Sequence, residues 1–205
     1  MHWIEREKVI AVVRLDDLDG AVALTQALVA GGVTAVEFTY TNRQAGGAIE
    51  RVRDALGDRC LVGAGTVLDP ETARAAILAG AQFLVTPTLN PRTIEMARRY
   101  GVTTVIGAFT ATEMLTASEA GADYIKVHPA SLGGPQYFKD ILAPLPHLKL
   151  VPSGGVSIQM APEFLKAGAV AVAAGGSLVG RGSLDAAGLV SVTERARAFR
   201  QAVNL

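Results

Sequence analysis

Short hydrophobic runs alternate with longer amphipathic stretches along the whole chain. One phrase recurs between them: a small residue or tyrosine, then a glycine, then an apolar run. The glycines in this phrase stand at positions 32, 80, 101, 121 and 168, with gaps of 48, 21, 20 and 47 residues, which is one or two units of about twenty. Such a glycine is typical of the left-handed residue that ends a helix, so the pattern predicts a repeated helix–glycine–strand unit.

The repeat predicts eight strands separated by helices. We expect the strands at 9–14, 34–39, 60–64, 82–86, 103–107, 123–128, 149–152 and 170–174. Eight alternating βα units with no linker or change of composition predict a single α/β domain over residues 1–205, a (β/α)8 TIM barrel. An open doubly wound sheet is the alternative.

Capping residues place the helices between these strands. We expect one helix over 17–29, opened by Asp16 or Asp17, and another over 70–78, opened by Asp69 with proline in its first position. The last helix is expected over about 183–203.

Composition restricts the possible partners and the compartment. The 19 acidic and 19 basic residues cancel without a basic stripe, so neither nucleic acid nor an anionic membrane is an expected partner. Cys60 is the only cysteine, so no intrachain disulfide can form. The first eight residues are too polar for a secretory signal, and the longest small apolar run, 167–179, is too short to span a bilayer. We expect a soluble cytoplasmic protein.

The stretch 123–130 carries the most informative lysine. Side chains alternate along a strand, so Tyr124, Lys126 and His128 share one face, and the apolar side chains between them share the other. If helices cover the apolar face, Lys126 points into the barrel. Burial disfavours the charged ammonium, which makes a neutral amine available to condense with a ketone as a Schiff base. The alternative is an edge-strand lysine in water.

A glutamate is expected beside this lysine. In the second strand, Val36 and Phe38 suit the helix-facing side, which turns Glu37 inward. A lone buried carboxylate is unfavourable unless it is paired or used in catalysis. Glu37 is therefore either a proton shuttle for Lys126 or its partner in a purely structural ion pair.

The remaining strand ends predict an anion site. Glycine pairs end the last two strands, in Ser153-Gly154-Gly155 and Gly175-Gly176-Ser177. Glycine lets backbone N–H groups approach an anion, and barrels commonly bind phosphate in these two loops. Gly63 and Gly65 end the third strand, where we expect them to leave space for a ligand near the Thr66 hydroxyl.

Metal ligands are scarce. The three histidines, His2, His128 and His147, have no metal-binding spacing, so we expect no zinc or iron site. His128 shares the Lys126 face, so we interpret it as a residue that shapes the pocket.

Taken together, the strand-end motifs resemble those of the Schiff-base aldolases for 2-dehydro-3-deoxy-6-phosphogluconate and 2-dehydro-3-deoxy-6-phosphogalactonate. The motifs follow one another in that family's order over nearly the whole chain: Glu37-Phe38-Thr39, Gly63-Ala64-Gly65-Thr66-Val67-Leu68, Thr86-Pro87, Lys126-Val127-His128-Pro129-Ala130, Ser153-Gly154-Gly155 and Gly175-Gly176-Ser177.

The resemblance implies a metal-free, cofactor-free barrel, usually a homotrimer. It implies that Lys126 forms the Schiff base and Glu37 is the general acid and base, yielding pyruvate and D-glyceraldehyde 3-phosphate from a phosphorylated 2-keto-3-deoxy sugar acid. Thr66 would hold the pyruvate-derived carboxylate, and Pro87 would line the substrate site. The phosphate cradle would be formed by Gly154, Gly155, Gly176 and Ser177.

The chain departs from the family pattern at two positions. Many gluconate-type members have an arginine four positions after the glutamate, where this chain has Thr41, so Arg14 is the expected substitute in carboxylate binding. His128 replaces an aromatic residue usual at its position. The ending Val13-Arg14 and the stretch 134–139 look more like the galactonate-type branch.

Two alternative functions remain. An aldolase for 4-hydroxy-2-oxoglutarate would use the same lysine without needing the phosphate cradle. A metal-free phosphosugar barrel, either an isomerase or synthase or a non-catalytic sensor, would use the cradle without needing an inward lysine.

Overall fold

A computed structural model describes residues 3–180 and 184–204. Its eight strands are all parallel and form one sheet in the order β7-β6-β5-β4-β3-β2-β1-β8. They are β1 (Val9–Val13), β2 (Ala35–Thr39), β3 (Leu61–Gly65), β4 (Phe83–Val85), β5 (Thr103–Ala108), β6 (Tyr124–Val127), β7 (Leu150–Pro152) and β8 (Val172–Ala174).

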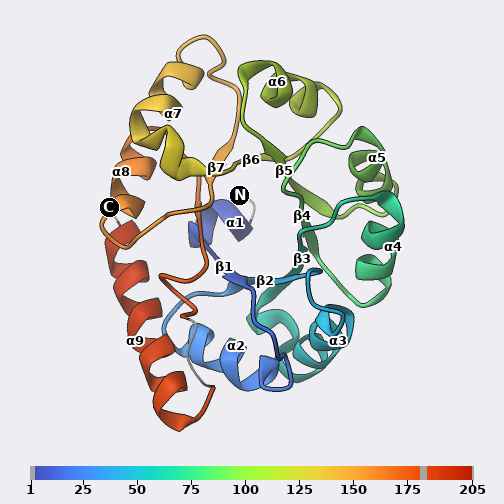
Figure 1. Cartoon of the computed structure of the whole chain (residues 1–205), viewed down its shortest axis with the longest axis vertical. Coiled ribbons are helices and arrows are strands. Elements are labelled where there is room, and N and C mark those ends of the chain that lie inside the picture. Colours follow the sequence, from blue (N-terminus) through green and yellow to red (C-terminus); the bar gives the residue numbers. More distant parts are fainter. Residues whose placement is uncertain (1–2, 181–183, 205) are drawn as a thin grey trace.

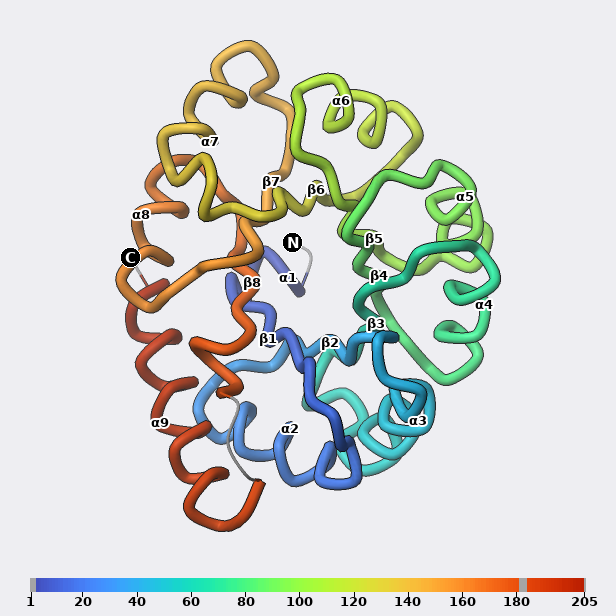
Figure 2. The backbone as a smooth tube through the Cα atoms, in the orientation of Figure 1, coloured from blue at the N-terminus to red at the C-terminus, as the bar shows by residue number. Residues whose placement is uncertain are grey.

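The sheet closes on itself between its first and last members. Figure 2 shows β8 lying between β1 and β7. The backbone N–H of Val170 donates to the carbonyl of Leu150 at 3.0 Å, and Ser153 pairs with Ala173 in an isolated parallel bridge. The predicted (β/α)8 barrel is confirmed, and the open doubly wound alternative is wrong.

Helices surround the ring of strands, except the first one, which lies inside the ring in the view of Figure 1. They are α1 (Trp3–Glu7), α2 (Ala21–Ala30), α3 (Ala45–Leu56), α4 (Pro70–Leu78), α5 (Pro91–Arg99), α6 (Ala111–Glu119), α7 (Gly134–Leu142), α8 (Met160–Lys166) and α9 (Ala186–Val203), with 3-10 turns η1 (Gly57–Arg59) and η2 (Ala130–Leu132). All five glycines of the recurring phrase have φ between 66° and 101°, which confirms the helix-ending role. No described helix is both long and apolar enough to cross a membrane.

The predicted helix starts were right for one helix and wrong for another. Asp69 caps α4 by accepting the N–H of Thr72 at 2.6 Å, as expected. The helix expected over 17–29 begins instead at Ala21, because Asp17 accepts the N–H of Asp19 in a local turn and caps nothing. The last helix begins at Ala186, and its expected start at 183 lies outside the described residues.

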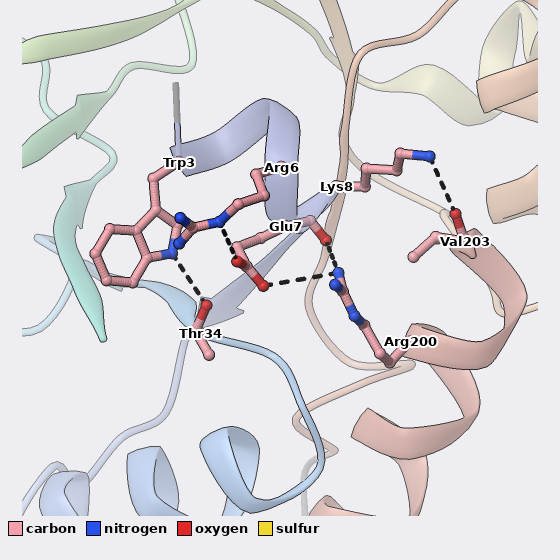
Figure 3. Close-up of polar contacts among 7 residues, drawn as sticks. All are labelled: Trp3, Arg6, Glu7, Lys8, Thr34, Arg200 and Val203. Atoms are coloured by element: carbon pink, nitrogen blue, oxygen red, sulfur yellow. Dashed lines mark hydrogen bonds and ion pairs between the residues drawn. The ribbon is translucent and has the colours of Figure 1, made fainter. Parts of the chain in front are cut away.

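The short helix α1 is bound to the N-terminal end of the barrel (Figure 3). The indole N–H of Trp3 donates to the Thr34 hydroxyl at 3.0 Å, and Arg200 of α9 donates to the backbone carbonyl of Glu7 at 2.6 Å. Ile4 is buried among the side chains inside the barrel. The end of the barrel opposite the polar strand ends is therefore packed with apolar side chains.

The hydrophobic residues form two separate cores. The larger lies between strands and helices, and contains the Ile125/Val127 and Val36/Phe38 faces that the sequence assigned to it. The smaller fills the barrel interior, for example with Ala35, Phe83 and Tyr124. Because the two faces of each strand are both covered, any polar side chain on the inner face is buried unless it reaches the C-terminal opening.

Candidate active site

Lys126 and Glu37 occupy inner-face positions one layer above the interior core. Tyr124 and Ala35 belong to that core, and Lys126 and Glu37 follow them by two residues on the same strand faces. Lys126 is 4 % exposed and Glu37 is 1 % exposed. The alternative of an edge-strand lysine in water is therefore wrong.

Glu37 is a buried carboxyl group without a hydrogen-bond partner. Neither of its carboxylate oxygens accepts a hydrogen bond in the part of the chain that the structure describes. Burial raises the pKa of Glu37 above 4.5, and the positive charges of Lys126 and Arg14 oppose this rise. The two cations are thus close enough to act on Glu37 electrostatically, but the tight structural ion pair between Glu37 and Lys126 is not formed.

Glycines of β3 make room for this arrangement. A Cβ at Gly65 would lie 2.9 Å from the Glu37 carboxyl carbon, and one at Gly63 would lie 2.5 Å from the Phe83 ring. We expected both glycines to leave space for a ligand, and this was wrong. Their space is filled by Phe83 and by the Glu37 side chain, which only a glycine neighbour permits.

A cavity of about 560 Å³ opens over the ends of β1, β6, β7 and β8. Lys126 lies in its wall, so the buried amine can be reached by a ligand. The structure brings most of the sequence-predicted site residues together around it, namely Arg14, Lys126, His128, Gly154, Gly155, Gly176 and Ser177.

Three predicted residues do not line this cavity. Glu37 lies below the opening, and Thr66 and Pro87 are half-buried on the opposite side of the barrel. Thr66 has a φ of 56°, a backbone conformation that residues other than glycine rarely adopt. Pro87 approaches β5 so closely that a Cβ at Gly107 would lie 2.2 Å from its carbonyl carbon. Because neither residue lines the cavity, a contact of Thr66 or Pro87 with the substrate stays a prediction.

The two glycine loops have the geometry of an anion cradle. Gly154 and Gly155 have φ of 86° and 80°, and Cβ atoms there would lie 2.9 Å from the His128 ring and 2.6 Å from Ser131. A Cβ at Gly176 would meet nothing within 4 Å. Among the described residues, the backbone N–H groups of Gly155, Gly176 and Ser177 donate no hydrogen bond. Backbone N–H groups that have no acceptor within the protein can donate to a bound anion.

Side chains hold these loops in position. The Ser177 hydroxyl donates to the carbonyl of Val156 at 2.6 Å, which joins the loop after β8 to the loop after β7. The His128 ring lies 3.2 Å from the carbonyl of Ser153 through Nδ1. Burial, and then the charge of Lys126, lower the pKa of His128.

Sequence reasoning missed several cavity residues. Val12, Val156, Ser157 and Val179 also line the cavity. Val12 could have been found, since it precedes Arg14 by two on the same strand face. Ser157 gave no such signal, because a serine just before a helix is ordinary. In the structure its hydroxyl accepts the N–H of Met160 at 3.3 Å, near the start of α8. Within residues 3–180 and 184–204, no three His, Cys, Asp or Glu side chains are placed to hold a metal ion.

Sequence comparison identifies relatives along the whole chain. Residues 2–194 match the family model described as KDPG and KHG aldolase. The chain is 36 % identical over 204 residues to a 2-dehydro-3-deoxy-6-phosphogalactonate aldolase of Escherichia coli (strain K12), covering 99 % of this chain and 100 % of the relative. It is 35 % identical over 203 residues to a 2-dehydro-3-deoxy-phosphogluconate aldolase of Treponema pallidum (strain Nichols), covering 98 % and 96 %.

Solved structures agree with these relatives. The native KDPGal structure superposes with a TM-score of 0.91 at 36 % identity, covering 100 % of both chains. A KDPG aldolase from Legionella pneumophila, with pyruvate captured as a covalent carbinolamine intermediate, has a TM-score of 0.87 at 27 % identity and covers 94 % of both chains.

Proposed function

This chain belongs to the KDPG and KHG aldolase family, so it is an aldehyde-lyase, and we propose that Lys126 and Glu37 are its catalytic pair. The proposed reaction cleaves 2-dehydro-3-deoxy-6-phosphogalactonate or 2-dehydro-3-deoxy-6-phosphogluconate to pyruvate and D-glyceraldehyde 3-phosphate. The observation that carries the proposal is that Lys126, only 4 % exposed, lies in the wall of the cavity with the unpartnered Glu37 carboxyl group nearby.

The first stage forms the Schiff base. The amine of Lys126 adds to the C2 ketone, and the resulting carbinolamine loses its hydroxyl group as water. Glu37 donates the proton that this departure requires. Because burial raises the pKa of Glu37, the carboxyl group holds a proton at a higher pH than an exposed glutamate does.

The second stage breaks the carbon–carbon bond. Glu37, now a carboxylate, removes the proton of the C4 hydroxyl directly or through a water. The C3–C4 bond breaks, its electron pair moves into the protonated imine to give an enamine, and the aldehyde leaves. Return of the proton to C3 and hydrolysis of the imine release pyruvate and the free amine.

The glycine loops are proposed to hold the phosphate at the far end of the substrate. Their N–H groups supply donors, and binding there orients the C3–C4 bond over Lys126. We expect Arg14 and Thr66 to contact the carboxylate of the substrate, and Pro87 to border the substrate.

A charge placed in the cradle tests this assignment. The variant Gly176→Asp adds a carboxylate where a Cβ meets nothing within 4 Å, so the fold can accommodate it. Repulsion of the phosphate is expected to raise KM for the phosphorylated substrate by about tenfold or more. KM for 4-hydroxy-2-oxoglutarate, which has no phosphate, should change much less in the same steady-state assay. An equal rise in KM for both substrates would contradict phosphate binding by the glycine loops.

Pyruvate release decides among the remaining functions. Steady-state assays with the galactonate, gluconate and hydroxyoxoglutarate substrates give kcat/KM for each. We expect a phosphorylated substrate to be preferred, because the cavity wall includes the two glycine loops. Preference for hydroxyoxoglutarate would favour the unphosphorylated alternative. Binding of sugar phosphate without pyruvate release would favour a sensor or an isomerase.

Assembly and compartment complete the proposal. Aldolases of this family bind phosphorylated keto-deoxy sugar acids, and we expect this one to be a cytoplasmic homotrimer built from single-domain chains. Support for the trimer comes from the sequence resemblance alone. Sedimentation equilibrium should give about three times the chain mass of 21.3 kDa, and a single-chain mass would contradict the trimer.

A further inference from the structure

The orientation of the His128 ring determines what its second nitrogen can do. Nδ1 lies 3.2 Å from the carbonyl oxygen of Ser153, and a carbonyl oxygen only accepts. Nδ1 therefore carries the hydrogen, which leaves Nε2 of the neutral ring as a hydrogen-bond acceptor. Among the described residues, Nε2 contacts no hydrogen-bonding partner, and the side chain lines the cavity.

His128 also lies between the two ends of the proposed substrate site. It follows Lys126 by two residues, toward the C-terminal opening of the barrel. On its other side it contacts the first glycine of the cradle, where a Cβ at Gly154 would lie 2.9 Å from Nδ1. The middle carbons of a substrate bound to both the Lys126 amine and the cradle would therefore lie beside the His128 ring.

We propose that Nε2 of His128 accepts a hydrogen bond from the C5 hydroxyl of the substrate and selects for that hydroxyl. This rests on the proposed function, in which Lys126 holds C2 and the cradle holds the phosphate on C6. The hydroxyl groups between these points are at C4 and C5, and the C4 hydroxyl gives its proton to Glu37. In the condensation direction, the C5 hydroxyl is the 2-hydroxyl of the incoming aldehyde. His128 is thus a specificity residue for 2-hydroxyaldehyde phosphates.

An aldehyde lacking the hydroxyl tests the proposal. Condensation of pyruvate is measured with D-glyceraldehyde 3-phosphate and with 3-oxopropyl phosphate, and the ratio of their kcat/KM values is compared between wild type and His128→Phe. Intrinsic reactivity of the aldehydes cancels in this comparison. The wild-type ratio is expected to exceed the variant ratio by about tenfold, since one hydrogen bond and its unpaired acceptor are involved.

Two controls make the result decisive. His147→Phe makes the same substitution at an exposed position outside the cavity and should keep the wild-type ratio. His128→Gln, which retains a hydrogen-bond acceptor, should keep part of the discrimination. Equal ratios in wild type and His128→Phe would overturn the inference. Trapping of pyruvate on wild-type Lys126 with borohydride tests the proposed function separately, so failure of one is distinguishable from failure of the other.

Discussion

Replacing Lys126 with methionine is expected to lower kcat/KM for aldol cleavage by about 10⁴-fold or more, because the whole covalent route depends on one amine. Methionine has a similar length and suits a site that is 4 % exposed, so the fold should persist. The measurement is pyruvate release by the purified variant, with circular dichroism to verify folding.

The matched control for this variant is Lys139→Met. Lys139 lies on α7, is exposed, and does not line the cavity. Its replacement should leave kcat/KM within about twofold of wild type, since surface substitutions rarely disturb a distant site. Appreciable cleavage by a folded Lys126→Met variant would contradict a Schiff-base mechanism through Lys126.

Replacing Glu37 with glutamine is expected to lower kcat by about 10²- to 10⁴-fold, the usual contribution of a positioned acid or base. Glutamine matches the shape of glutamate, so the space beside Gly65 stays filled in the same way. The variant should still bind pyruvate at the cavity, because Lys126 is untouched. A kcat near the wild-type value would exclude Glu37 as the proton shuttle.

The same substitution should stabilise the fold near neutral pH. Burial raises the pKa of Glu37 above 4.5 in the folded chain, so between 4.5 and the raised value the unfolded chain releases this proton while the folded chain keeps it. Stability is therefore lost as pH rises through this window. Above it, Glu37→Gln should raise the free energy of unfolding by about 1 kcal/mol, and below it the two proteins should match. Urea denaturation of both proteins, at one pH below 4.5 and at one pH above the window, measures this difference in the free energy of unfolding.

The repeat of glycines made the barrel predictable. Each of the five glycines ends a helix in the left-handed conformation, and the strands that follow lie within a few residues of the expected positions. Alternation along β2 and β6 likewise placed Glu37 and Lys126 on the inner face. These properties are local, because they depend on backbone conformation and on which face of one strand is apolar.

What could not be predicted depends on contacts between distant segments. The loop before α2 is held by Gln44, whose side chain accepts the N–H of Leu18 at 3.0 Å, and by Asn42, which donates to the carbonyl of Leu15 at 2.9 Å. Those contacts, and the local turn at Asp17, delay the helix start. The space beside Gly63 is filled by the Phe83 ring from the neighbouring strand, which no pattern within β3 could reveal.

Borohydride trapping tests the central claim most directly. The wild-type chain is incubated with pyruvate and borohydride, digested, and mapped by mass spectrometry. The buried, ligand-accessible amine predicts one reduced pyruvyl group, carried by Lys126 and missing from Lys126→Met. Recovery of unmodified wild-type chain, or of the group on any other lysine, would contradict it.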